Sequence, residues 1–454
     1  MNDTTSKTST EIFLHGIMEL FRKDIPQSVL DKARLSLADY IGVTLAGATV
    51  MRDKIERYVQ QEQLEPGEIK AIGMDQGMNL KDAVFFNGLN GHALDFDDGT
   101  NTGIIHLGSP IFSVLLPLAQ KYKVDSTKFL EAAVIGYETS FTMAASIQPT
   151  HKELGYHATG TCGVLGISLA VAYMLDFTEE QAQNAFSIAC VSATGMLSVL
   201  DDHSELKPYN VAKSALLGLI SIQMARMGFL GHSDPLGGGR GYLKMMTGEA
   251  LVDFKQPHLN GTYAIEKTYT KPYAACRYCH PAIEAAITLR EKYRIIASEV
   301  SAIHVKTYYW AVNKHDHTDI SGVSSAKMSI PYGIAVGLIY GKAGLSEYTM
   351  EQVKNRTILD LTSKVSVESD DELTAQFPAV TAAVLTLTTK SGQEFMERVD
   401  FPKGEPENPM TEKEFTERFI ELAVYGGKKR EESAEMLEFI KKMDGCMDRL
   451  YQYL

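Results

Sequence analysis

Carboxylates crowd one short segment of the chain, which contains Asp95, Asp97 and Asp98 within four positions and is followed by His106. Such a group can orient a histidine or bind a substrate, and we expect Asp95 to act in this way. The plain alternative is a helix end whose aspartates cap neighbouring turns. A magnesium and diphosphate site, as in helical isoprenoid synthases, would need a second Asp-rich segment to surround the hard cation, and the sequence contains none.

Two further segments place a basic side chain where a helix is predicted to begin. His157 directly precedes a very apolar stretch, and the amides at a helix N-terminus favour an anion. Lys207 stands before Pro208 and Tyr209 in a similar way, and its ammonium would supply the cation that a substrate carboxylate needs. A buried core histidine and a solvated surface lysine are the ordinary interpretations of these residues. Both segments therefore need corroboration from their neighbours.

The densest chemical segment runs from Lys271 to Pro281 and contains Cys276, Cys279 and His280. Its Cys-x-x-Cys-His pattern matches c-type haem attachment, but that modification belongs to exported proteins and the N-terminus does not resemble a signal peptide. A zinc site would need about four ligands, and no second pair stands at matching spacing. We interpret the segment as a basic, imidazole-bearing pocket for an anion.

The composition limits the kinds of partner. The chain has 454 residues, 44% of them hydrophobic and 22% charged, which is typical of a globular protein with more than one domain. Its net charge of −13 argues against nucleic acid or an anionic membrane, because both attract basic faces. Five cysteines with one close pair favour the reducing cytoplasm. The uncharged stretch from Leu154 to Leu175 contains histidine, threonine and glycine, which favours a buried helix over a membrane span.

Apolar residues at helical spacing predict an all-helical domain over residues 1–266. The predicted helices, each bounded by Gly, Pro, Asp or Ser, cover residues 26–47, 79–95, 110–122, 126–146, 160–175, 178–200 and 209–229. Thr178 and Gln181 form a predicted capping box at the start of one of them.

The pattern changes over residues 267–404, where β-branched and alternating stretches predict a smaller α+β lid domain. It includes a hairpin of residues 380–389 and 394–401 around a Lys-Ser-Gly turn. Residues 405–454 are helical and charged again, and they are predicted to pack back on the helical domain. The fold class is thus mainly α, a large all-helical domain plus a smaller α+β lid, with the cleft between them as the expected binding site.

Taken together, these segments resemble the MmgE/PrpD family over nearly the whole chain. The motifs that carry the resemblance are Asp39-Tyr-Ile-Gly42, Asn87-Gly88 to Asp98, Gly136-Tyr-Glu138, His157 with Gly160-Thr161, Lys207-Pro208, Gly228-Phe-Leu-Gly231, Lys271 to Pro281, and Ser329-Ile-Pro-Tyr332. Each motif alone is weak evidence, whereas eight motifs in order are strong.

The resemblance implies a homodimer and a lyase that acts on a small polycarboxylate without metal or organic cofactor. The family includes 2-methylcitrate dehydratase, cis-aconitate decarboxylase and iminodisuccinate epimerase. Its pocket residues correspond here to Asp95, Thr100, His106, His157, Lys207, Lys271 and Tyr332, with Cys276 in place of a pocket histidine and His280 in the same segment.

The reaction class dictates the expected roles. A proton beside a carboxylate is weakly acidic, because its removal adds charge to a group that is already anionic. We therefore expect Lys207 and Lys271 to hold the substrate carboxylate, and His106 and His157 to form the acid/base pair. The same residues would serve an epimerase or racemase of a dicarboxylate, which is the nearest alternative. A non-catalytic helical binding protein is the more distant alternative.

Overall fold

The computed structural model describes residues 7–200 and 204–454, so the N-terminal residues that argue against a signal peptide lie mostly outside the described part. The chain divides into two compact units. The helical unit comprises residues 1–268 and 413–454, and the mixed unit comprises residues 269–412. The mixed unit therefore interrupts the helical unit in the sequence, and each is described by itself.

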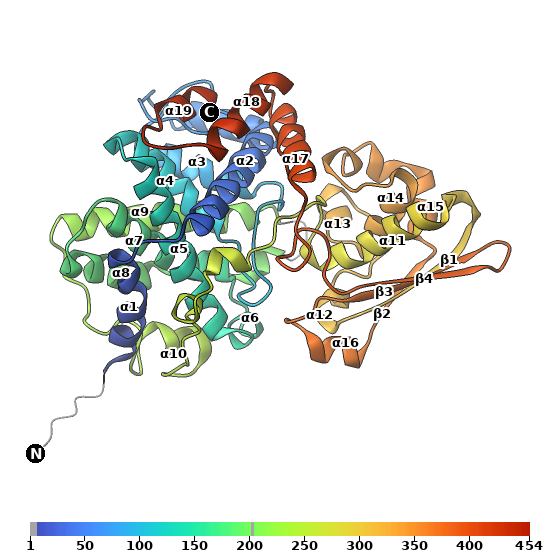
Figure 1. The fold of residues 1–454 in the computed structure, drawn as a ribbon, viewed down its shortest axis with the longest axis horizontal. Helices are drawn as coiled ribbons and strands as arrows, with labels where there is room; N and C mark the ends of the chain where they lie inside the picture. The colour runs from blue at the N-terminus through green and yellow to red at the C-terminus, as the bar shows by residue number, and fades with distance from the viewer. Residues whose placement is uncertain (1–6, 201–203) are drawn as a thin grey trace, which may run out of the picture. The chain divides into compact units, whose positions relative to one another are not determined.

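Every regular element in the described residues of the helical unit is a helix, which confirms the predicted mainly α class (Figure 1). Its helices are α1 (Ser9–Glu19), α2 (Gln27–Gln61), α3 (Leu80–His92), α4 (Gly108–Tyr122), α5 (Ser126–Ile147), α6 (Thr150–Glu153), α7 (Ala158–Met174), α8 (Glu179–Ser192), α9 (Lys207–Arg226), α10 (Tyr242–Thr247), α17 (Glu412–Tyr425), α18 (Arg430–Lys441) and α19 (Asp448–Tyr453).

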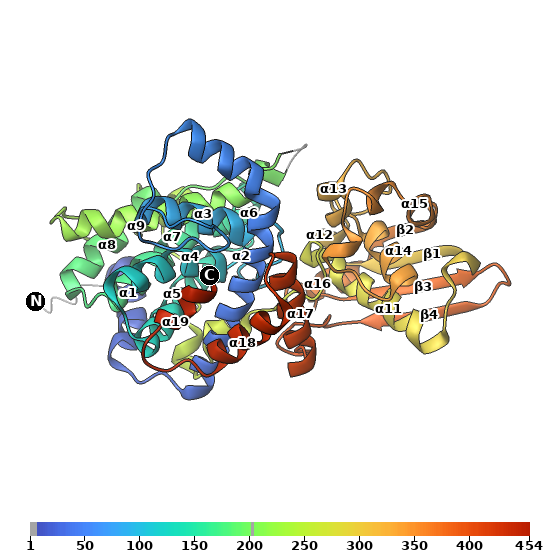
Figure 2. The ribbon, with the colours of Figure 1, turned by 90° about the horizontal axis from the view of Figure 1, so that it is seen from above.

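Helix α7 forms the core of this unit, and every residue in it except Tyr173 is buried. It packs against α4, α5, α8 and α9 (Figure 2). Fully burying a leucine or isoleucine such as Leu165 or Ile167 stabilises the fold by about 1.5–3 kcal/mol, so this uncharged helix anchors its neighbours. Among the helices of the described ranges, none combines the length and apolar character needed to cross a membrane.

One predicted helix ends earlier than its sequence pattern indicates. The capping box of Thr178 and Gln181 is confirmed, but α8 stops at Ser192 and not at Leu200. The chain then runs beside the segment that precedes α7, where the amide of His157 donates to the carbonyl of Gly195 at 3.1 Å. The absence of a side chain at Gly160 permits this, because a Cβ there would lie 2.7 Å from the carbonyl oxygen of Thr194.

Helices α3 and α9 approach each other unusually closely. A Cβ at Gly88 of α3 would lie 2.5 Å from the Cα atom of Ala212 in α9, so the position requires glycine. This close contact brings the C-terminal end of α3 near the N-terminal end of α9. Both ends carry candidate site residues.

The C-terminal helices contact the helical unit through buried polar groups as well as apolar ones. Helix α18 packs against α2. In α17 the guanidinium of Arg418 pairs with the carboxylate of Asp39 and also donates to the carbonyl of Phe96 at 3.0 Å. Because Phe96 lies in the Asp-rich segment, this hydrogen bond connects helix α17 to the candidate site.

The mixed unit contains a four-stranded sheet in the order β2-β1-β3-β4. Strand β1 (Val300–Thr307) pairs in parallel with β2 (Val365–Ser369) and antiparallel with β3 (Ala383–Thr389). Strand β4 (Glu394–Val399) completes the predicted hairpin with β3. Two of its helices, α11 and α14, lie on one side of the sheet (Figure 1). The helices of this unit are α11 (His280–Tyr293), α12 (Tyr309–Val312), α13 (Val323–Lys327), α14 (Ile330–Tyr340), α15 (Arg356–Thr362) and α16 (Asp371–Gln376).

The Arg418–Asp39 pair gives a stability prediction. Substitution Arg418→Met should lower the free energy of unfolding by about 3–5 kcal/mol, because it leaves the Asp39 carboxylate buried without its cation. The matched control is Arg430→Met, which breaks the exposed pair with Glu417 and should leave the free energy of unfolding nearly unchanged. Urea unfolding followed by far-UV circular dichroism checks both, and equal losses would contradict the prediction.

Candidate active site

The loop between α3 and α4 presents most of the site. After His92 the chain turns sharply at Asp95, whose φ of 52° lies in the left-handed region that aspartate tolerates better than most residues. The backbone of Thr100 then pairs with that of Ile105, with an N–H···O distance of 3.0 Å. This bridge closes the loop and returns His106 to the carboxylates.

A lysine, a carboxylate and an imidazole lie in line at the centre of the site. The ammonium of Lys207, the first residue of α9, lies 2.6 Å from Oδ2 of Asp95. The other carboxylate oxygen of Asp95 lies 3.6 Å from Nε2 of His106. The side chains of Lys207, Asp95 and His106 keep exposed fractions of 19%, 16% and 12%. A small molecule can therefore reach all three.

The backbone fixes the tautomer of His106. Its Nδ1 lies 2.8 Å from the carbonyl oxygen of Asp98, which can only accept, so Nδ1 carries a proton. In the neutral ring the lone pair is then on Nε2, on the side of Asp95. A proton gained at Nε2 would be stabilised by that carboxylate, so His106 has the arrangement of a base.

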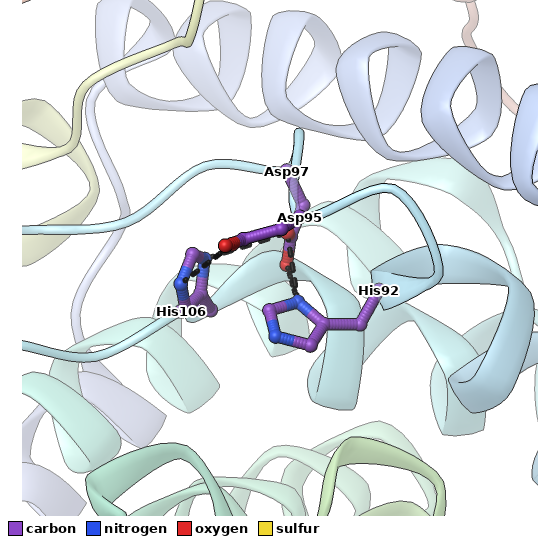
Figure 3. A group of neighbouring side chains, drawn as sticks. All are labelled: His92, Asp95, Asp97 and His106. Atoms are coloured by element: carbon purple, nitrogen blue, oxygen red, sulfur yellow. Dashed lines mark hydrogen bonds and ion pairs between the residues drawn. The ribbon is translucent and has the colours of Figure 1, made fainter. Parts of the chain in front are cut away.

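His92 is a second imidazole in the site, and the sequence analysis did not select it. Its Nδ1 lies 2.8 Å from Oδ1 of Asp97, and Ser109 donates to the other oxygen of Asp97 at 2.7 Å. Figure 3 shows Asp95 and Asp97 facing the rings of His106 and His92. Nε2 of His92 is buried and has no hydrogen-bond partner among the described residues. The signal available in the sequence was its place three residues before Asp95.

Asp98 has the structural role that the plain interpretation assigned to the whole segment. Its carboxylate accepts from the amide of Gly108 at 2.9 Å, at the start of α4, and from the hydroxyl of Tyr137 at 2.6 Å. Burial raises the pKa of Asp98 to about 7, although the Tyr137 hydrogen bond acts in the opposite direction.

His157 lies near His92, and its charged neighbours include Lys207, His106 and Asp95. The ring centroid of His92 lies 4.5 Å from that of His106 and 6.5 Å from that of His157. Nδ1 of His157 lies 3.1 Å from the side-chain nitrogen Nδ2 of Asn210, a residue in the first turn of α9. Burial, reinforced by the Lys207 ammonium, holds the pKa of His157 well below its ordinary value. The sequence analysis missed Asn210, although it stands three residues after Lys207.

The predicted substrate-binding residues Lys271, Cys276, His280 and Tyr332 lie in the mixed unit, and their roles stay predictions. Lys271 is buried. Both ring nitrogens of His280 have partners within the unit, Arg277 at 2.9 Å and the carbonyl of Ala275 at 3.1 Å. The Tyr332 hydroxyl donates to the carbonyl of Glu347 at 2.9 Å.

Four side chains of the cluster could also surround a cation. Donor atoms of His92, Asp95, Asp97 and His106 all lie within 4.8 Å of one another (Figure 3). However, the Lys207 ammonium already neutralises Asp95, and Nδ1 of His92 already donates to Asp97. Both carboxylates of the cluster thus already have partners within the protein.

Comparison with known proteins identifies the class to which this fold and site belong. Residues 14–255 match the MmgE/PrpD N-terminal domain, and residues 273–442 match the MmgE/PrpD C-terminal domain. The chain belongs to the MmgE/PrpD family.

Relatives with curated functions include decarboxylases and dehydratases. The cis-aconitate decarboxylase of Aspergillus terreus is 25% identical over 93% of this chain and 90% of its own length. The mouse cis-aconitate decarboxylase is 21% identical over 91% of this chain and 86% of its own length. The 2-methylcitrate dehydratase of Escherichia coli K12 is 23% identical over 56% of this chain and 55% of its own length. The chain is accordingly an enzyme of the lyase class.

The shifted pKa of Asp98 gives a pH prediction. Between about pH 4 and pH 7 the folded protein keeps this proton and the unfolded chain does not, so the free energy of unfolding falls as pH rises through that window. Substitution Asp98→Asn removes this contribution. Relative to Asp98→Asn, the wild type should therefore lose about 1 kcal/mol of its free energy of unfolding for each pH unit between pH 5 and pH 7.

Urea unfolding of both proteins at several pH values measures this difference. Asp31→Asn, at an exposed aspartate on α2, controls for the loss of one carboxyl group. Parallel stability curves for the wild type and Asp98→Asn would show that Asp98 is ionised throughout.

Proposed function

We propose that this lyase removes carbon dioxide or water from a small citrate-like polycarboxylate, using only its own side chains. The observation that carries the proposal is the line of Lys207, Asp95 and His106, which combines a cation, an orienting carboxylate and a fixed imidazole base at a partly exposed position. This set is what a carbanion beside a carboxylate requires.

Lys207 supplies the positive charge. Its place at the first residue of α9 adds the N-terminal amides of that helix, which also favour an anion. A substrate carboxylate that enters here shares the ammonium with Asp95. Negative charge that develops on the carboxylate is then stabilised by a group that is already in place.

His106 moves the proton. In a dehydration its Nε2 takes a proton from the carbon beside the carboxylate, and the electron pair forms the new double bond. The protonated ring then gives this proton to the departing hydroxyl, which leaves as water. In a decarboxylation the bond to carbon dioxide breaks, the electron pair stays on carbon, and a protonated His106 delivers the proton. Asp95 stabilises the charged ring in both cases.

The relatives support this class of substrate. Their names specify cis-aconitate and 2-methylcitrate, which are both tricarboxylates with a reacting carbon beside a carboxylate. Identities of 21–25% support the class and leave the individual acid open. A cytoplasmic location and a homodimeric state remain part of the proposal. All five cysteines lie in the described ranges as thiols, which supports a reducing compartment.

The direct test is incubation of the purified protein with cis-aconitate, citrate, 2-methylcitrate and an amino-dicarboxylate in turn, in deuterated buffer with EDTA, followed by proton NMR. We expect turnover of a tricarboxylate with unchanged rates in EDTA, and the product distinguishes decarboxylation from dehydration. Exchange of deuterium into a substrate that only interconverts between stereoisomers would instead establish an epimerase. Loss of activity in EDTA would contradict the cofactor-independent mechanism.

The roles of His106 and Lys207 are tested by substitution. His106→Asn should lower kcat by about 10²–10⁴-fold, because it removes the base. Lys207→Met should cause a loss of similar size, because it removes the fixed charge. Matched controls are His15→Asn and Lys123→Met, whose side chains are 65% and 72% exposed, and both should keep wild-type rates. Full activity of His106→Asn in a folded protein would refute its role as the base.

A further inference from the structure

We propose that Asn210 and Lys213 are positioning residues that hold His157 with its only ring proton on Nε2, so that His157 serves as a fixed hydrogen-bond donor and not as a base. The catalytic consequence rests on the proposed function. The state of the ring itself does not, and it can be measured without any substrate.

Two partners fix the orientation of the Asn210 amide. The ammonium of Lys213 lies 3.2 Å from Oδ1 of Asn210, and an ammonium can only donate. The carbonyl oxygen of Met196 lies 3.2 Å from Nδ2 of Asn210, and a carbonyl can only accept. A flipped amide would set nitrogen against the ammonium and oxygen against the carbonyl. The orientation with Nδ2 towards Met196 is therefore favoured on both sides.

The same nitrogen of Asn210 lies 3.1 Å from Nδ1 of His157. Because Nδ2 is a donor, Nδ1 of His157 must be the acceptor, and the proton of the neutral ring is then on Nε2. Protonation of Nδ1 would place two N–H groups against each other in a buried site, where an unsatisfied donor costs about 1–3 kcal/mol. Asn210 thus sets the tautomer and also opposes the imidazolium form.

Most of the charged groups around His157 also oppose its imidazolium form. Lys207 and Lys213 come from α9, His92 comes from the end of α3, and Asp95 and His106 come from the following loop. Asp95 alone favours a charged ring, and it is already paired with Lys207. Burial and the nearby cations hold the pKa of His157 well below its ordinary value, so the ring stays neutral across the physiological range.

His106 and His157 therefore have opposite tautomers and different tasks. The carbonyl of Asp98 keeps the proton of His106 on Nδ1, which leaves Nε2 as a lone pair. Asn210 keeps the proton of His157 on Nε2. In the reaction the proton moves between the substrate carbon and His106, while His157 keeps its proton and donates a hydrogen bond to the carboxylate oxygen that gains negative charge. A neutral imidazole that acts as an electrophile in this way has a precedent in enzyme chemistry.

The decisive measurement is long-range ¹H–¹⁵N NMR of protein labelled with ¹⁵N-histidine, recorded from pH 5.5 to pH 8.5. His157→Gln assigns the signals by their disappearance. We expect His157 to show an unprotonated Nδ1 and a protonated Nε2 with no titration over this range. A proton on Nδ1, or titration to imidazolium within the range, would overturn the inference.

The role of Asn210 is tested by Asn210→Asp. A carboxylate in place of the amide accepts a hydrogen bond, so the proton of His157 should move to Nδ1 and the ring should titrate near or above pH 7. Asn184→Asp in α8, the same change at an asparagine that caps the amide of Gly231, should leave the His157 signals unchanged. If Asn210→Asp does not fold, Asn210→Ala should show a mixture of both tautomers. An unchanged His157 spectrum in either folded variant would show that Asn210 does not set the tautomer.

Kinetics then separate this inference from the proposed function. Gln at position 157 keeps an N–H donor, so His157→Gln should retain about tenfold more kcat than His157→Phe. At position 106 Gln and Phe should be equally inactive. An equal loss of kcat in His157→Gln and His157→Phe would contradict the role of His157 as a hydrogen-bond donor. If the wild type turns over no polycarboxylate, the proposed function fails, and the NMR result still decides the state of His157.

Discussion

The ion pair between Lys207 and Asp95 is the interaction on which the site depends. It joins the start of α9 to the loop after α3, two segments that are distant in the sequence, with a separation of 2.6 Å between charged atoms. A charge pair that is mostly removed from water is costly unless its geometry is good and its other lone pairs are satisfied. The tight contact of Gly88 with Ala212 supplies that geometry, because it fixes the distance between the two helices. The partial exposure of the pair leaves room for a substrate carboxylate to join it.

The three imidazoles of the site have different partners at Nδ1, and each partner sets the tautomer of its ring. A backbone carbonyl faces Nδ1 of His106, which places the lone pair of the neutral ring on Nε2, towards Asp95. A carboxylate faces Nδ1 of His92, and because a carboxylate accepts, the proton of the neutral ring is on Nδ1. An amide N–H faces Nδ1 of His157, which excludes a proton there. The hydrogen-bond partner of one ring nitrogen thus assigns the role of the other.

Much of the fold followed from periodicity, because helix patterns and caps are local. The mainly α class, the capping box of Thr178 and the β3–β4 hairpin were predicted correctly. The end of α8 was predicted wrongly, because the segment after Ser192 leaves the helix to pair with the chain near His157, a contact that no local pattern encodes. For the site, residue type and motif indicated Asp95, His106 and Lys207. They did not indicate His92 or Asn210, whose importance depends on partners that only folding brings near.

The three neighbouring aspartates show why a motif alone could not assign roles. The turn at Asp95 directs its carboxylate to Lys207, whereas Asp97 holds His92 and Asp98 caps the start of α4. Asp97 and Asp98 therefore support the scaffold, and Asp95 is the one of the three that the proposed mechanism uses. Decarboxylation and dehydration both place negative charge beside a carboxylate and differ in the group that departs. Both reactions can therefore use the same three proposed groups: the cation of Lys207, the base of His106 and the hydrogen-bond donor of His157. Relatives of both kinds, at similarly low identity, are therefore compatible with the centre proposed for this chain.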